Sequence, residues 1–120
     1  MTKVFGALYS FFSGFGLPAW AENDVPDGAA LPYITVKLTA PDWTQNGSIY
    51  VRVWYRSRSF VEVAAKAGEI WDAIGAGAVE PFEGGSIWIY RDGPGPQHMA
   101  FEGDPDLKCM YLPLQLGVNA

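Results

Sequence analysis

The chain has 120 residues, of which 49% are hydrophobic and 18% are charged, and its formal net charge is -5. This length suits one domain with one core, and the apolar content argues against a disordered chain. Lys and Arg total only eight, so no basic stripe is available to neutralise a phosphate backbone. We therefore expect a single soluble domain over residues 1–120 that does not grip nucleic acid.

Aromatic residues make up 15% of the chain, with five Trp, six Tyr and seven Phe. A core of this size does not enclose so many rings, so some of them are expected at the surface. Exposed Trp and Tyr are typical of protein–protein interfaces. The composition thus favours a subunit of a larger assembly.

The first predicted element is a helix over residues 2–13. Val4, Leu8 and Phe12 recur at helical spacing, and Gly14 ends the pattern. The same apolar start resembles a signal peptide, but Ser and Gly residues interrupt the run, and the amphipathic helix is the favoured interpretation. No stretch is long enough to span a membrane.

Residues 17–32 contain three prolines and favour turns, which predicts a long ordered loop that carries Trp20. Ile34, Val36 and Leu38 then alternate with polar residues and predict a strand. A second alternating run covers residues 48–57. A turn at Gln45-Asn46-Gly47 joins the two runs, so we expect an antiparallel hairpin.

A second helix is expected from Ser59, where Ser59 and Glu62 fit a capping box. Gly75 ends it. Its apolar face is formed by helically spaced residues, namely Val63, Ala67, Ile70, Trp71 and Ile74.

Residues 86–91 are β-branched and aromatic and predict a strand with both faces covered. Residues 92–107 are rich in proline and glycine and predict an irregular segment. A last strand is expected over residues 108–116, at an edge or bulged because Pro113 cannot donate to a ladder. The predicted fold is α+β: a four-stranded, mainly antiparallel sheet with two helices on one face and long loops.

The sequence offers little for catalysis or for metal binding. His98 is the only histidine, and Glu102 is the only carboxylate at ligand spacing from it, so the pair is interpreted as a solvated loop pair. Cys109 is a lone cysteine with apolar neighbours and is interpreted as a buried thiol rather than a reactive one. We assign no catalytic, cofactor-binding or metal-binding residue and expect no enzyme.

The strand at residues 48–57 has one face of alternating cations and aromatics that includes Arg52, Trp54 and Arg56. Such a face can stack nucleic-acid bases, but the acidic balance disfavours that function. Arg and Trp are common anchors of protein interfaces, so a protein partner is the favoured interpretation. The alternative is that Trp54 is core beneath a helix, with the arginines at its rim.

Several segments, taken in order, resemble small tail-completion proteins of long-tailed bacteriophages of Firmicutes. They span nearly the whole chain, and their order carries the resemblance more than any one of them. The segments are Phe11-Phe12-Ser13-Gly14-Phe15-Gly16-Leu17-Pro18-Ala19, Val25-Pro26-Asp27-Gly28, Leu31-Pro32-Tyr33-Ile34-Thr35, Val53-Trp54-Tyr55-Arg56-Ser57 and Gly84-Gly85-Ser86-Ile87-Trp88-Ile89.

The resemblance implies a tail terminator, a virion protein of the tail and neck that is assembled in the cytoplasm of the bacterial host. Such a protein forms a hexameric ring that caps the tail tube, stops its polymerisation and offers a surface to the head-completion proteins. Its partners would be its own copies, the tube protein and a neck protein, while DNA only passes through the lumen.

Within that family, the interface would include Trp20, Arg52, Trp54 and Arg56. Residues 92–107 would form an arm with exposed Met99 and Phe101 that reaches the tube or the neck.

Three other interpretations stay open at this point. The first is another neck component, such as a head-closure, connector or minor capsid protein. The second is a small hydrolase or ligand-binding domain with an aromatic pocket around Trp71, Trp88 and Tyr90. The third is a host regulatory protein of the toxin–antitoxin type.

Overall fold

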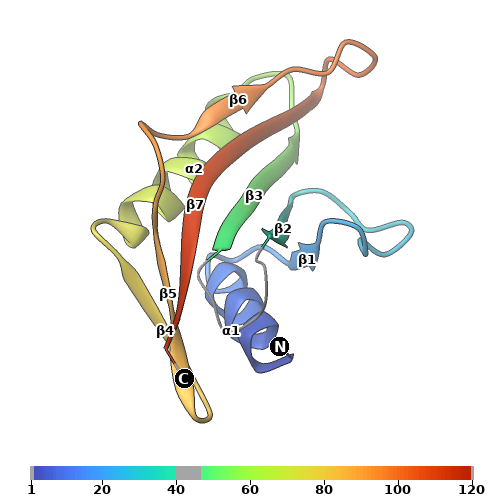
Figure 1. Ribbon diagram of the computed structural model, residues 1–120. Helices are drawn as coiled ribbons and strands as arrows, with labels where there is room; N and C mark the ends of the chain where they lie inside the picture. Colours follow the sequence, from blue (N-terminus) through green and yellow to red (C-terminus); the bar gives the residue numbers. More distant parts are fainter. Residues whose placement is uncertain (1, 40–46, 120) are drawn as a thin grey trace.

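The computed structural model describes residues 2–39 and 47–119. These residues form two helices, the first followed by three strands and the second by four (Figure 1). In chain order they are α1 (Thr2–Ser13), β1 (Ala19–Ala21), β2 (Tyr33–Thr39), β3 (Gly47–Arg56), α2 (Val61–Ile74), β4 (Ala78–Phe82), β5 (Gly85–Arg91), β6 (Gln97–Met99) and β7 (Leu107–Asn119).

The strands form one curled, mixed sheet in the order β1-β2-β3-β7-β5-β4. β1 pairs in parallel with β2, and the remaining pairs are antiparallel. β6 pairs with β7 beyond the end of β5. The α+β class is therefore confirmed, but the prediction of four strands is wrong, because β1, β4 and β6 join the sheet.

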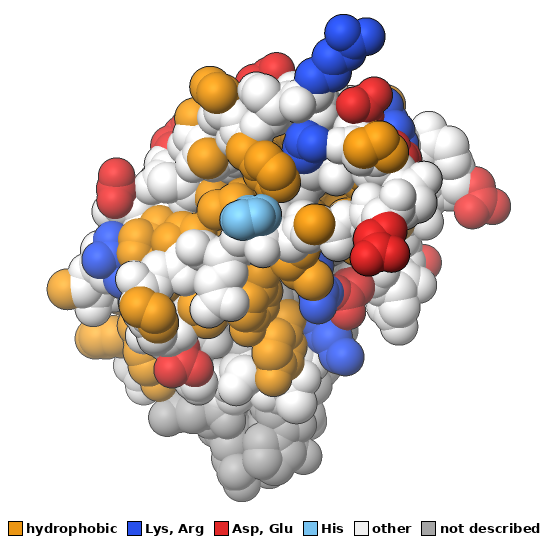
Figure 2. Space-filling view, turned by 90° about the horizontal axis from the view of Figure 1, so that it is seen from above, with side chains coloured by type: hydrophobic (Ala, Val, Ile, Leu, Met, Phe, Trp, Pro, Cys, Tyr) orange, Lys and Arg blue, Asp and Glu red, His pale blue; other side chains and the backbone are white. Residues whose placement is uncertain are grey.

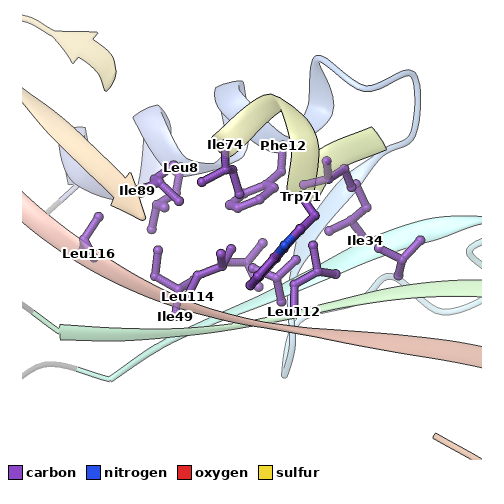
Figure 3. Close-up of a cluster of buried hydrophobic side chains, with 14 of the residues drawn as sticks. Leu8, Phe12, Ile34, Ile49, Trp71, Ile74, Ile89, Leu112, Leu114 and Leu116 are labelled. Atoms are coloured by element: carbon purple, nitrogen blue, oxygen red, sulfur yellow. The ribbon is translucent and has the colours of Figure 1, made fainter. Parts of the chain in front are cut away.

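Both helices pack on the concave side of the sheet, which we call the inner face. Figure 3 shows Leu8 and Phe12 of α1 and Trp71 and Ile74 of α2 pointing toward strand residues such as Leu114. The alternating apolar residues of β2, β3 and β7 share this face because strand side chains repeat with a period of two. Every helical position predicted to be apolar on α2 is buried.

The start of α2 differs from the predicted capping box. Phe60 occupies the N-cap position and provides no side-chain hydrogen bond to the helix. The Ser59 hydroxyl instead accepts a hydrogen bond from the Val61 backbone N–H, two residues on, at 3.3 Å. Ser59 therefore closes a local turn before the helix, a bonding pattern that competes with the capping box.

Pro113 was expected at an edge or a bulge, yet it lies in the central strand β7. Its carbonyl accepts a hydrogen bond from the Asp92 backbone N–H at 2.9 Å, so its nitrogen faces the same side of β7. The pairs with β5 extend only to Leu114 and those with β6 begin at Tyr111. Pro113 therefore lies between the part of β7 that pairs with β5 and the part that pairs with β6. No ladder hydrogen bond is lost there, although Pro113 has no N–H.

The prediction of a β2–β3 hairpin is confirmed by an antiparallel register that pairs Ile34 with Val53 and Leu38 with Ile49. The turn predicted to join the two strands lies, apart from Gly47, outside the described residues. The strand predicted at residues 86–91 is β5, and its unexpected partner β4 pairs Val79 with Trp88.

Candidate interaction surface

The face of the sheet opposite the helices, which we call the outer face, gathers aromatic and arginine side chains. The register places Trp20, Thr35 and Arg52 side by side across β1, β2 and β3. Trp54 and Arg56 follow Arg52 on the same face, because the side chains of β3 alternate between faces. The sequence therefore predicted correctly that Arg52, Trp54 and Arg56 share a face.

Trp54 is half-buried at the centre of a polar and aromatic cluster. Its indole Nε1 donates a hydrogen bond to the Thr35 hydroxyl at 2.9 Å, and Thr35 is the buried polar residue of β2. The ring of Phe101 stacks on the indole, with 5.4 Å between centroids and 30° between the ring planes. Trp54 is thus on the helix-free face, which overturns the alternative that it is core beneath a helix.

Arg52 is held between an acid and an aromatic ring. Its guanidinium forms an ion pair with the Glu22 carboxylate and lies 6.0 Å from the centre of the Tyr111 ring. Tyr111 in turn stacks on Tyr50 at 6.0 Å between centroids. Burial, followed by the neighbouring Tyr50, raises the pKa of the Tyr111 hydroxyl. These contacts orient Arg52 across the sheet and leave it little freedom to bind a distant phosphate.

Within the suggested arm of residues 92–107, we call residues 97–106 the arm. It begins with β6, which pairs with β7 as part of the sheet, and continues to Phe101, which packs on the outer face. The Arg56 Nη1 is 3.0 Å from a carboxylate oxygen of Asp104, and the Ser57 backbone N–H donates to the Asp106 carbonyl at 2.8 Å. Met99 and Phe101 are half-buried against the sheet rather than exposed as expected. The free arm that the sequence suggested is therefore docked on its own domain.

Cys109 lies beneath the arm. Its Sγ is 4.0 Å from the sulfur of Met99, and its side chain is fully buried. Burial raises the pKa of the Cys109 thiol to about 12, which keeps it protonated at neutral pH. The interpretation of Cys109 as a buried thiol is confirmed.

Trp20 differs from Trp54 although both indoles belong to the outer face. Its ring is half-buried, and its N–H is buried without an acceptor among residues 2–39 and 47–119. A buried donor without an acceptor destabilises the fold. An acceptor from another molecule would remove that penalty.

The β4–β5 hairpin adds an apolar feature that the sequence did not predict. Val79 and Trp88 are cross-strand neighbours on the outer face, and they are 52% and 50% exposed. Trp88 also lies opposite Gly117 of β7, and a hollow of about 300 Å³ remains beside it. The prediction that both faces of this strand are covered is therefore wrong.

The aromatic pocket suggested around Trp71, Trp88 and Tyr90 does not form. Trp71 is buried on the inner face under the guanidinium of Arg91, at 4.9 Å from its ring centre. Trp88 points to the opposite side of the sheet. The two indoles therefore cannot line one cavity. The pocket on which the ligand-binding interpretation was based is not formed by these residues.

Figure 2 shows the molecule from above, with the pale blue side chain of His98 among hydrophobic side chains. The His98 ring packs edge-on against Phe60, with 4.7 Å between centroids. Among the residues that the structure describes, no group of three or more His, Cys, Asp or Glu side chains is placed to hold a metal ion. No helix in the described part of the chain is long and apolar enough to cross a membrane.

Comparisons with known proteins give one informative result. No family model matches the chain, and no curated protein matches it. A solved chain from the virion of a native gene transfer agent particle has a similar fold, with a TM-score of 0.64 and 20% sequence identity, and the match covers 100% of both chains. The similarity shows that the whole of this chain shares its fold with that protein.

Proposed function

We propose that this chain is a structural subunit of a phage-like virion. The observation that supports this proposal most is the likeness to a chain from a gene transfer agent virion, because it covers 100% of both chains. The outer face, with its aromatic and arginine side chains, suits a chain that works by contact with other proteins.

Within the virion, we assign the chain to the tail terminator position. A ring of its copies, which we take as hexameric, caps the tail tube, stops tube polymerisation and offers a surface to the neck. The order of the sequence segments described above supports this finer assignment. The ring is assembled in the host cytoplasm and contacts the tube protein on one side and a head-completion protein on the other.

The acidic balance fits a ring with a lumen through which DNA slides. The net charge of -5 repels a phosphate backbone, and the outer-face guanidinium of Arg52 is already paired with Glu22. DNA therefore passes through the lumen without being bound by the protein. The function requires no cofactor and no catalytic residue.

Electron microscopy of tail-tube protein from the same genome tests the assignment. We expect tubes that are limited in length and capped at one end by a sixfold ring when this protein is added, and uncapped tubes without it. Tyr50→Glu, which places a charge at the centre of the outer face, should reduce capping. Val61→Glu is the matched control, because Val61 lies on α2 and is already 73% exposed.

Uncapped tubes in the presence of the unaltered protein would contradict the terminator assignment. In that case the same protein should be mixed with the portal-side adaptor. Binding to the adaptor would identify a head-closure or connector protein, which is the alternative neck component.

A further inference from the structure

Two surface features lie at opposite ends of the sheet and have no partner within the described residues. The β4–β5 hairpin ends the strand order at one side, and β1 and β2 end it at the other. In Figure 1, α1 lies between the two ends. One feature is an apolar projection and the other is a groove.

The projection consists of Val79 and Trp88, and we call it the Trp88 knob. The two side chains adjoin across β4 and β5 and are the most exposed large apolar residues of the sheet. Gly117, opposite Trp88 on β7, has no side chain to cover the indole. The indole N–H has no protein acceptor among the described residues, so it needs one if the ring becomes buried.

The groove lies between α1 and the outer strands β1 and β2, and its volume is about 560 Å³. This volume falls within the range of about 300–1,000 Å³ that holds drug-sized ligands, so it has room for one indole ring. Its lining combines apolar side chains with a polar rim and consists of Phe5, Tyr9, Ala21, Glu22, Asn23, Asp24, Val36, Lys37 and Leu38.

The rim of the groove provides the acceptor that the knob lacks. None of the ion pairs among the described residues involves the Asp24 carboxylate, and Asp24 is exposed at the rim of the groove. Asp24 and Tyr9 both line the groove, and burial and, second, the Asp24 charge raise the pKa of the Tyr9 hydroxyl. Phe5 and Tyr9 stack at 6.2 Å between centroids and offer an aromatic wall.

We propose that the Trp88 knob of one copy inserts into the α1–β2 groove of the next copy. This inference rests on the proposed ring, and it names the two patches that join its subunits. A ring needs a heterologous contact, in which two different patches meet, and patches at opposite ends of one sheet satisfy that requirement. The residues that line the hollow beside Trp88, including Tyr90 and Gly117, carry no charge that would oppose Asp24 or Lys37.

Sedimentation of the full chain, alone and with tail-tube protein, tests the contact. Trp88→Ala removes the knob and Asp24→Ala removes the acceptor, and each should weaken self-association at about 150 mM salt, where the repulsion between acidic copies is screened. For Trp88→Ala we expect a loss of at least about 30-fold, as is usual for a buried interfacial Trp. Val61→Ala is the control, because it truncates a more exposed apolar residue outside both patches and should change nothing.

Cross-linking decides which patches meet and leaves both of them intact. In a Cys109→Ala background, Asn119→Cys marks the rim of the knob and Asn23→Cys marks the rim of the groove. A short bis-maleimide should link a mixture of the two single-cysteine chains and should not link either chain alone. Linking of the Asn119→Cys chain with itself would overturn the proposal, because it would indicate a twofold contact between knobs.

The outcomes separate this inference from the proposed function. Capped tubes together with unchanged assembly of Trp88→Ala and no mixed cross-link would overturn the knob-and-groove contact and leave the terminator assignment standing. Mixed cross-links and rings that do not bind tubes would support the contact and contradict the terminator assignment. A protein that stays monomeric both alone and with the tube protein would overturn the contact itself.

Discussion

The hydrogen bond between Trp54 and Thr35 joins β3 to β2 on the outer face. Thr35 is buried, and its hydroxyl accepts the indole N–H at 2.9 Å. Trp54→Phe leaves this hydroxyl without its donor, so we expect the free energy of unfolding to fall by about 1–3 kcal/mol. Adding Thr35→Val removes the orphaned hydroxyl and should restore part of that loss, as measured by denaturant unfolding in a double-mutant cycle.

Trp20 supplies the matched comparison for this prediction. Its indole N–H is buried without an acceptor among the described residues, so Trp20→Phe removes an unsatisfied donor. Trp20→Phe should therefore destabilise the isolated protein less than Trp54→Phe does. Equal losses in the two variants would show that ring size, rather than the hydrogen bond, determines the effect.

Cys109 should make stability depend on alkaline pH. Its pKa in the folded protein is about 12, against an ordinary value of 9.0, so above pH 9 the unfolded chain releases a proton that the folded chain retains. The unfolded state is then favoured, and stability falls as pH rises from about 9 to 12, by at most about 1.4 kcal/mol per pH unit for this group. Unfolding measured across this range should show a shallower decline for Cys109→Ala, and identical slopes would contradict the buried-thiol account.

At the scale of elements, the arm is held by the β6–β7 ladder, by polar contacts at the end of β3 and by the ring of Phe101 on Trp54. Phe101→Ala removes the ring that stacks on Trp54 and should weaken local closure of the arm by about 1–2 kcal/mol. Backbone amides of β6 and of Ser57 should then exchange with solvent roughly tenfold faster, while those at the centre of β3 stay protected. Hydrogen exchange followed by mass spectrometry measures both regions.

Glu102→Ala is the control for the arm, because Glu102 is the exposed neighbour of Phe101. It should leave exchange in β6 and at Ser57 unchanged. Faster exchange throughout β3 in Phe101→Ala would instead mean that the arm and the sheet open as one unit.

Long periodic elements could be predicted from the sequence, and short strands could not. Both helices, β2, β3 and β5 have enough apolar repeats to reveal their period. β1 and β6 have three residues each, and β4 contains Pro81, so their pairing depends on neighbours that are remote in sequence. These strands form because β2, β7 and β5 offer them unpaired edges.

The same limit applies to the candidate surface. The period of two in β3 placed Arg52, Trp54 and Arg56 on one face without any tertiary information. The exposure of Trp88 depends on the register that sets it against Gly117, and the burial of Phe101 depends on the path of the arm. Neither the register nor the path leaves a local signal in the sequence.

At the scale of the whole molecule, the distribution of charge restricts how copies associate. At least five of the eight Lys and Arg side chains form ion pairs with carboxylates of the same chain, namely Lys3, Arg52, Arg56, Lys66 and Arg91. Few cations therefore remain to bind the acidic surface of a neighbour. A contact between copies must depend mainly on apolar burial, as the Trp88 knob would provide.

This distribution predicts that salt strengthens self-association. Each copy has a net charge of -5, so copies repel one another, and raising the salt from about 10 mM to 150 mM shortens the Debye length from about 30 to 8 Å. We expect the dissociation constant between copies, measured by sedimentation, to fall over this range and then to level off. Lys37→Glu, which adds negative charge beside the groove, should steepen the dependence, whereas Lys3→Glu should do so less because Lys3 lies outside the groove. Association that weakens with salt would contradict an apolar contact and would indicate ion pairs between copies.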